Sequence, residues 1–440
     1  MKNRFTWKRF LALALIAVMV LAMTACGSAP ANETAAPTAK APEAPSEAAK
    51  VTEKVTLKFQ QWWGVELPEG YLEDICAKFE ADTGIKVELI SAPWSDTKTA
   101  ITAGAANGTI ADIVSVDGAW LSEFVDMGIL TDVEAAGVKT DLAGDIWKVN
   151  GTKYVVPVNN FTYPLYVNLD ILDKAGVETI PTTWSELIDA CAKISKAGYS
   201  AFALNLGTTN ANGIQNVFMG TGWASGIHLK DSSDKYVTEG NAELAELAQL
   251  FKTLYDAGSL YPGMSTLEES EMTSNFAAGN CAFTLASAAT MSRFSDVNFD
   301  TATVPVKDGY TGQSGICYAS WAVGISESSK HKAEAAQFIN YLLGGLDGTD
   351  GSISAGLAET MTAFPNSVVA EPDYSNAPEQ FQKFYELYKK NYVINEFIGL
   401  PNASDVMTNM TNDLVLYLEG DMDCDTMLAN WQGYLDSAGK

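Results

Sequence analysis

Hydrophobic and polar positions along most of the chain follow two alternating periods. Residues 55–59 read Val-Thr-Leu-Lys-Phe, the period-two pattern of a half-buried strand, and residues 85–90 and 110–116 are further short apolar runs. Residues 71–81 have helical spacing and end before Gly84. Because strand and helix signals alternate in this way, the sequence predicts an α/β fold.

Several predicted helices carry recognisable ends. Thr183 and Glu186 fit a capping box for a helix that turns one apolar face inward. Asn241 can cap a longer helix that ends before Gly258. An extended segment is predicted at residues 154–158, and helices at residues 120–127, 333–343, 379–391, 405–419 and 425–435.

The N-terminal residues have the pattern of a lipoprotein signal. Four basic residues precede the apolar residues 10–23, and Thr24-Ala25-Cys26-Gly27 follows. The apolar stretch is too short and wrongly flanked for a membrane span, so residues 1–25 are predicted to be a signal peptide. Cys26 is then the lipidated first residue, held by two acyl chains at about 0.8 kcal/mol per buried methylene. An ordinary signal with a chance cysteine is the alternative.

Residues 26–52 differ in composition from the rest of the chain. Ala, Pro, Ser, Glu and Thr dominate and aromatic residues are absent, so this stretch cannot bury enough apolar surface to fold. Its prolines favour an extended chain. We expect a tether that holds the folded part outside the cytoplasm, anchored to the membrane through Cys26. No later stretch reaches the roughly 18 apolar residues of a spanning helix.

The remaining chain is long and acidic. Roughly 390 residues exceed what one hydrophobic core usually supports, which predicts two domains. The full sequence has a formal net charge of −26, and removal of the signal removes four more basic residues. Nucleic acid and anionic membrane surfaces would repel such a protein, so both are excluded as partners.

Cysteine and histidine are poorly placed for metal or redox chemistry. Five cysteines follow Cys26, an odd number without CxxC spacing, and the chain has two histidines. Cys76 and Cys191 lie on apolar faces of predicted helices, where cysteine acts as a small hydrophobe. The sequence therefore predicts no metal site, no cofactor and no disulfide framework.

Seven segments in order resemble the sugar-binding family of bacterial extracellular solute-binding proteins, which includes maltose-binding protein. They span roughly residues 52–345 and include KFQQWWG, IPTTWSELIDACAKI and NFAAGNCAFTLASAA. The others are FEADTGIKVELI, AGAANGTIADIVSVDGAWLSEFVDMGILTDV, NGTKYVVPVNNFTYPLYVNLDILDKAG and ASWAVGISESSKHKAEAAQFINYLL. The C-terminal hundred residues match only in helical character.

The resemblance implies a two-lobe periplasmic-binding-protein fold, type II-like, with a hinge and a cleft between the lobes. By position, lobe 1 comprises residues 53–160 plus about 320–345. Lobe 2 comprises about residues 161–318 plus 346–440. The chain is expected to cross between lobes near residues 159–163, 316–321 and 344–351.

The resemblance also implies the function of an importer subunit. The chain is expected to bind a sugar or oligosaccharide in the cleft and deliver it to the membrane-spanning permease of an ABC transporter. We expect a monomer that catalyses no reaction.

Sugars need flat aromatic platforms for their ring faces and planar hydrogen-bonding groups for their hydroxyls. Trp62 and Trp63 end the first strand on opposite sides, so at most one faces the cleft. Asp117 and Trp120 follow the strand at residues 110–116. Asp117 could instead cap the next helix, and Trp120 could pack in the core.

The other candidate ligand contacts lie at the crossings and in the second lobe. Asn159, Asn160 and Tyr163 lie at the first crossing, where Asn is also common for turn chemistry. Ser287 stands where relatives often carry a Trp over the sugar. The remaining candidates are Asn205, Trp223 in a Gly-rich loop, and Trp321 at the second crossing. Trp94, Trp147, Trp184 and Trp431 are expected to pack structurally.

Three other functions compete with sugar binding. A secreted glycosidase would use two carboxylates about 5–10 Å apart, but 54 acidic residues supply such pairs by chance. A binding protein for a polyamine or peptide would need other groups in the cleft, several carboxylates in the polyamine case. A surface adhesin or sensory protein could use the same fold.

Overall fold

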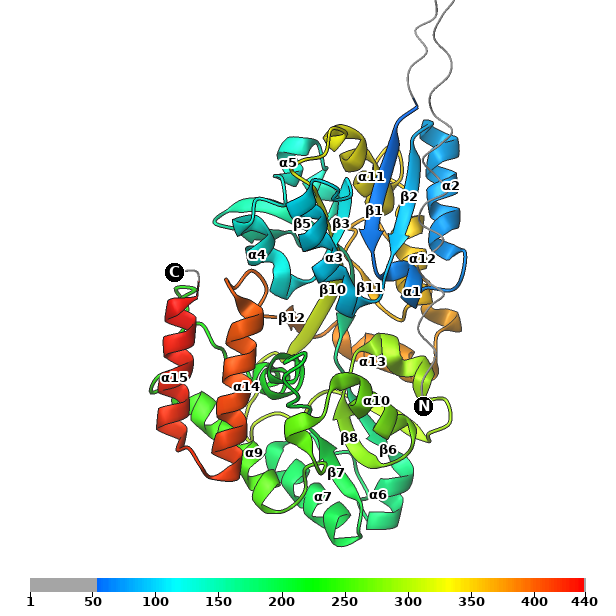
Figure 1. The fold of residues 1–440 in the computed structure, drawn as a ribbon. Helices are drawn as coiled ribbons and strands as arrows, with labels where there is room; N and C mark the ends of the chain where they lie inside the picture. The colour runs from blue at the N-terminus through cyan, green and yellow to red at the C-terminus, as the bar shows by residue number, and fades with distance from the viewer. Residues whose placement is uncertain (1–53, 439–440) are drawn as a thin grey trace, which may run out of the picture. The chain divides into compact units, whose positions relative to one another are not determined.

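A computed structural model describes residues 54–438, and the predicted signal, Cys26 and tether lie outside the described residues. The chain forms two β-sheets with helices packed on both (Figure 1). The first sheet contains β1 (Thr56–Gln61), β2 (Lys86–Ser91), β3 (Ile113–Val116), β4 (Trp147–Val149), β5 (Thr152–Thr162), β10 (Gly315–Ile325), β11 (Phe364–Pro365) and β12 (Tyr392–Ile394). The second contains β6 (Leu165–Asn168), β7 (Ser200–Ala203), β8 (Cys281–Leu285) and β9 (Phe299–Ala302).

The first sheet is mixed, in the order β11-β5-β10-β3-β1-β2. β1 pairs in parallel with both β2 and β3, whereas β10 runs antiparallel to β3 and β5. In the second sheet the order is β7-β8-β6-β9, and β7 and β8 are parallel. The carboxyl ends of β1, β2 and β3 therefore meet at one edge of the first sheet, which is where ligands bind in open α/β sheets.

The helices before β6 are α1 (Trp63–Glu66), α2 (Tyr71–Thr83), α3 (Trp94–Asn107), α4 (Leu121–Asp126) and α5 (Val133–Ala136). Those of the central region are α6 (Leu169–Ala175), α7 (Trp184–Lys196), α8 (Gly220–Ala224), α9 (Ala242–Asp256) and α10 (Glu269–Ala277). The C-terminal region has α11 (Lys332–Gly344), α12 (Ser352–Thr360), α13 (Glu379–Tyr388), α14 (Ala403–Glu419) and α15 (Cys424–Ser437). Within residues 54–438, no helix has the length and apolar character that a membrane crossing needs.

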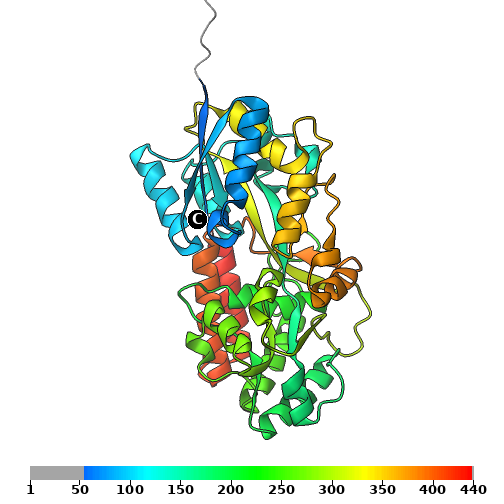
Figure 2. The same cartoon turned by 90° about the vertical axis from the view of Figure 1, so that its right-hand side faces the viewer.

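Two hydrophobic cores correspond to the two sheets. One surrounds the first sheet, with α2, α11 and α12 packed beside one another on it (Figure 2). The contact between Phe79 of α2 and Phe338 of α11, with ring centroids 5.1 Å apart, belongs to this core. The other surrounds the second sheet and includes α9, α14 and α15. The described residues therefore hold two hydrophobic cores, one around each sheet.

Local expectations hold at the predicted helix ends. Thr183 and Glu186 form the capping box of α7, and Asn241 accepts hydrogen bonds from the first turn of α9. Cys76 and Cys191 are buried as predicted. All five cysteines of the described region are free thiols, four of them buried and Cys424 partly exposed.

One crossing differs from its expected position near residues 344–351. α12 follows that stretch, packs against α11 and buries Leu357 in the first core. β11 then pairs with β5 of the first sheet. α12 therefore packs on lobe 1 rather than lobe 2, whereas the side chain of Phe364 in β11 belongs to the second core. α13 then packs on β9 of the second sheet. An amphipathic helix does not reveal in its sequence which sheet it covers.

Candidate functional site

A cavity of about 600 Å³ lies off the carboxyl ends of strands from both sheets. Residues after β1, β2 and β3 line it on one side, and residues after β7 and β8 line it on the other. The first turns of α14 contribute Ser404, Met407 and Thr408. This position and volume are typical of a small-molecule site between two α/β units.

One wall of the cavity is aromatic. Trp94 opens α3 directly after β2, and its indole stacks on that of Trp120 with centroids 5.4 Å apart. Trp62 packs its edge against Trp120 from behind, at 5.6 Å. Tyr163, between β5 and β6, also lines the cavity. These rings offer flat apolar faces to a bound molecule.

Asp117 lies beside the aromatic wall, immediately after β3. Its Oδ1 accepts a hydrogen bond from the Ala119 backbone N–H at 2.9 Å, and its Oδ2 accepts one from Trp94 Nε1 at 3.2 Å. Burial raises the pKa of Asp117, although these two donors and the charge of Lys98 act to lower it. Asp117 thus caps the short helix at Gly118–Trp120 and also lines the cavity.

The opposite wall is built from amides and carboxylates. Asn205, after β7, donates from Nδ2 to Asn212 Oδ1 at 3.0 Å, and Asn212 donates in turn to Glu269. Glu268 accepts from the backbone N–H groups of Thr209 and Asn210, at 3.1 and 3.3 Å. The start of α10 therefore holds the loop that carries Asn212 against the cavity.

Two cavity carboxyls have strongly perturbed pKa values. Burial raises the pKa of Glu269 to about 7, with the negative charge of Asp117 adding to the rise and the hydrogen bond from Asn212 opposing it. Desolvation of its carboxyl likewise raises the pKa of Glu66, in α1, to about 7; a hydrogen bond from Trp321 opposes the rise and the negative charge of Glu269 adds to it. Together with Asp117 and Glu268, these make four carboxyl groups that line the cavity.

Two cationic side chains also line the cavity. Lys98 forms an ion pair at 2.6 Å with Glu123, which is not part of the cavity lining. Arg293, at the end of the short helix Ala288–Phe294, is exposed. The cavity consequently offers many hydrogen-bond acceptors and an excess of negative charge.

Of the residues predicted to bind ligand, Asp117, Trp120 and Tyr163 line the cavity. Trp62 lies behind Trp120. Trp63 faces the core, as alternation allows for one of the pair, and stacks on Trp321 at 5.2 Å. The two indoles cover each other in the core, and neither lines the cavity.

The other predicted residues also lie outside the lining. Asn159 is fully buried at the pairing of β5 with β10, and Asn160 accepts a hydrogen bond from Ser320 at 2.6 Å. Asn205 supports Asn212 from behind. Ser287 caps the helix at Ala288–Phe294 through the backbone N–H of Ala289. Trp223 is buried and donates to Glu396 at 2.7 Å.

The sequence interpretation missed the residues that most shape the cavity. Trp94 was expected to pack structurally, but it forms the aromatic wall with Trp120. Its signal was its position directly after the predicted strand at residues 85–90, at a sheet edge where ligands bind. Glu66 and Glu269 gave no such signal, since α1 and α10 are helices that sequence patterns did not predict.

Comparisons with known proteins agree with this geometry. Residues 64–344 match the family model of the bacterial extracellular solute-binding protein. A binding protein of Brucella abortus (strain 2308) is 24% identical over 62% of this chain and 68% of its own length. The sn-glycerol-3-phosphate-binding periplasmic protein of Rhizobium meliloti (strain 1021) is 25% identical over 64% of this chain and 66% of that protein.

Among solved structures, the cyclic alpha-maltosyl-1,6-maltose binding protein of Arthrobacter globiformis superposes with a TM-score of 0.72. The match covers 88% of this chain and 99% of that one, at 18% identity. This likeness shows the two-lobe fold. Since the family model matches well over half of the chain, the protein belongs to the bacterial extracellular solute-binding protein family.

Proposed function

We propose that this protein is the extracytoplasmic substrate-binding subunit of an ABC importer and that it binds a sugar or oligosaccharide in the cavity. The observation that carries the proposal is the stacked Trp94–Trp120 wall with the Asp117 carboxylate beside it. A pyranose presents an apolar face to an indole while its hydroxyls donate to a carboxylate in the ring plane. The name of the structural neighbour from Arthrobacter globiformis describes a carbohydrate ligand as well.

The cavity has room for more than one sugar ring. A second cavity of about 590 Å³ shares Glu66 with the first, and it is lined by residues of α12 and of the segment before α13. The short helix at Ala288–Phe294 contributes to both cavities. This continuity supports an oligosaccharide as the ligand.

The remaining parts of the proposal follow from the family and the N-terminal pattern. Lobe 1 holds the first sheet and lobe 2 the second, with the expected boundaries moved so that α12 joins lobe 1. Cys26 anchors a monomer to the cell membrane, and the membrane-spanning permease subunits receive the ligand. The protein performs no chemistry on what it binds.

A second candidate ligand is a cationic solute such as a polyamine. The excess of carboxylates supports it, because Glu66, Asp117 and Glu269 face a common space while Lys98 is paired with Glu123. A polyamine would neutralise this repulsion and place its methylene chain on the indoles. Peptides gain no such specific support from the cavity.

A thermal-shift screen decides between the two ligand classes. The panel contains maltose, maltotriose, xylotriose, chitotriose, sn-glycerol 3-phosphate, putrescine and spermidine. A ligand at a hundredfold excess over its Kd stabilises the folded state by about 2.7 kcal/mol, which raises Tm by several degrees. A shift of Tm with a carbohydrate supports the proposal. If chromatography then recovers that carbohydrate unchanged, the protein is not a glycosidase that cleaves it. A shift with polyamines alone means that the sugar proposal is wrong.

A further inference from the structure

The segment at residues 395–402 joins β12 to α14. Its end contacts the cavity wall, and its start belongs to a network of hydrogen bonds around Glu396. The segment leads directly into the first two turns of α14, which place Ser404, Met407 and Thr408 in the cavity wall. Ser122 Oγ donates to Gly399 O at 2.5 Å, and Ile398 fits against Gly118, where an added Cβ would lie 2.6 Å from its side chain. This end therefore contacts the elements that carry Asp117 and Trp120.

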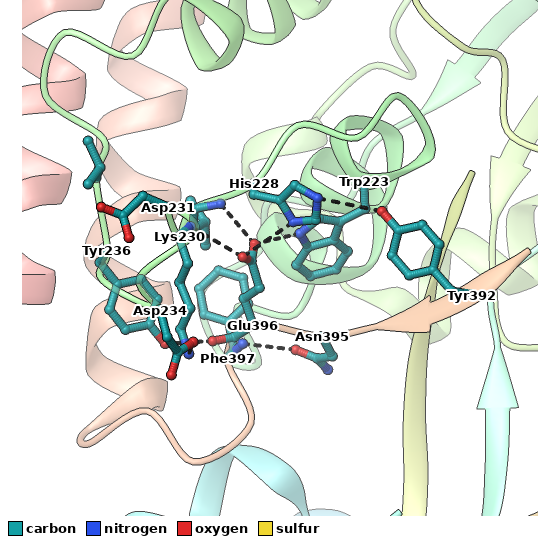
Figure 3. A network of polar contacts seen from close by, with 12 residues as sticks. Trp223, His228, Lys230, Asp231, Asp234, Tyr236, Tyr392, Asn395, Glu396 and Phe397 are labelled. Atoms are coloured by element: carbon teal, nitrogen blue, oxygen red, sulfur yellow. Dashed lines mark hydrogen bonds and ion pairs between the residues drawn. The ribbon is translucent and has the colours of Figure 1, made fainter. Parts of the chain in front are cut away.

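The other end of the segment is held by the Glu396 carboxylate, as Figure 3 shows. Its Oε2 accepts from Trp223 Nε1 at 2.7 Å and from the Leu229 backbone N–H at 2.8 Å. Its Oε1 accepts from the Lys230 backbone N–H at 3.2 Å and lies 3.5 Å from His228 Nδ1. Tyr236 Oη also donates to Glu396 O at 2.6 Å. We call these six residues the Glu396 network.

Four groups face the two side-chain oxygens of Glu396: Trp223 Nε1, the backbone N–H groups of Leu229 and Lys230, and His228 Nδ1. Only a carboxylate can accept hydrogen bonds from all four. A glutamine at this position would keep one accepting oxygen and turn an amide N–H₂ toward the other two donors. Burial raises the pKa of Glu396, but the hydrogen bonds from His228, Leu229 and Trp223 outweigh it and hold that pKa below its usual range. Glu396 is therefore ionised at neutral pH, and its hydrogen bonds are charge-assisted.

His228 is the group of the network that titrates near neutral pH. Its hydrogen bond to Glu396 raises the pKa of His228, while desolvation opposes the rise. From the other elements, Tyr392 of β12 lies 3.5 Å from Nε2, with Tyr310 nearby, and Glu243 of α9 adds negative charge. Lys230 is occupied by an ion pair with Asp234 at 2.9 Å. The imidazolium is thus the cation that faces Glu396.

We propose that Glu396 is a positioning residue for the ligand cavity, and that protonation of His228 strengthens its hold on the segment at residues 395–402. The segment transmits this hold to the first turn of α14 and to Gly118. The inference rests on the proposed function only in taking the cavity as the ligand site. A raised histidine pKa means that the ion pair is present below pH 6.5 and is lost as the pH rises through the folded-state value.

The first test follows the two histidines by NMR without any ligand. Because the chain has only His228 and His331, each ring can be assigned by one substitution, His228→Gln or His331→Gln. In Glu396→Gln the titration midpoint of His228 should fall, and that of His331 should stay. An unchanged midpoint of His228 would overturn the pairing on which the inference depends.

The second test measures backbone hydrogen exchange by mass spectrometry, also without ligand. Glu396→Gln should exchange about tenfold faster than wild type at residues 395–408 and 118–122, since charge-assisted hydrogen bonds are lost. The matched control is Glu186→Gln, which removes a capping carboxylate from α7, far from the segment in sequence. Its exchange should rise only near α7.

The pH profile separates positioning from a purely structural effect. After correction for intrinsic exchange, wild-type protection at residues 395–408 should fall between pH 6 and pH 8, and this fall should disappear in His228→Gln. Protection that is independent of pH in wild type, or equal in Glu396→Gln and wild type, contradicts the inference. Neither readout uses a carbohydrate, so a negative ligand screen would reject the proposed function without touching this result.

Discussion

At the scale of single residues, Asp117 combines two roles that the sequence offered as alternatives. It caps the short helix at Gly118–Trp120, and the same carboxylate lines the cavity beside Trp94. A cap alone would need no aromatic partner and no position at the edge of the sheet. The dual geometry means that stability and affinity must be measured separately for any Asp117 variant.

Asp117→Ala should weaken carbohydrate binding about ten- to a hundredfold, since a charged acceptor contributes roughly 1.5–3 kcal/mol. Isothermal titration with the carbohydrate that gives the largest thermal shift measures the loss. Asp132→Ala is the matched control, because Asp132 caps α5 through Glu134 and Ala135 in the same way but lies outside the cavity lining. Equal affinities for Asp117→Ala and wild type would remove Asp117 from the site.

Glu269→Gln should make the ligand-free protein more stable at pH 8. The folded-state pKa of Glu269 is about 7, above its usual 4.5, so its contribution to stability is present below about pH 4.5 and is lost as the pH rises through 7. Scanning calorimetry should show a higher Tm than wild type at pH 8 and little difference at pH 5.

Glu186→Gln, in contrast, should have a lower Tm than wild type at pH 8. Its pKa is lowered by hydrogen bonds from Thr182 and Thr183, so its charge stabilises the fold above pH 4.5. If the Tm of Glu269→Gln lies below that of wild type at pH 8, the ionised Glu269 carboxylate does not destabilise the fold.

At the scale of elements, local sequence patterns identified the helices with clear ends and missed those without them. The capping box at Thr183 and the cap at Asn241 are determined by neighbouring residues, so sequence alone located α7 and α9. α1, which carries Glu66, has no side-chain cap. α10, which carries Glu269, begins with a capping box between Glu268 and Glu271, but its N-cap is not the Ser, Thr, Asp or Asn that marks a helix start in a sequence. Trp94 was misjudged because its face is set by the packing of α3 on the sheet.

Gly213 lies where its own backbone closely approaches that of Asn205. A Cβ at this position would lie 1.5 Å from the carbonyl oxygen of Asn205, an overlap that forces the backbone apart. Gly213→Ala should therefore displace the loop with Asn212, lower Tm by several degrees and weaken binding together. Gly433→Ala is the control, since a Cβ there would meet open space. Equal melting curves for both variants would contradict this argument.

At the scale of the whole molecule, the cavity draws its walls from the surroundings of both sheets, so a ligand that fills it joins the two. The seven segments that resemble the family, taken in their order along the chain, predicted this arrangement. They did not predict that β11 pairs with β5 of the first sheet, because that pairing depends on Phe364 meeting Asn160 far away in the chain.

Ligand binding should favour a closed arrangement of the lobes. The radius of gyration from small-angle X-ray scattering should decrease when the carbohydrate found in the screen is added at saturating concentration. In Asp117→Ala the same decrease should require a higher concentration, in proportion to its Kd. A radius that stays constant while calorimetry shows binding would mean that the lobes do not move.

The stack of Trp94 on Trp120, with Trp62 at its edge, gives the protein a built-in optical reporter. Indoles 5.4 Å apart couple their electronic transitions, which produces a paired signal in circular dichroism and short-range energy transfer in fluorescence. A molecule seated on this wall excludes water from the outermost ring and alters both signals. Uptake and release can therefore be followed in real time with unlabelled protein, as a change on top of the signal of the buried Trp63–Trp321 stack.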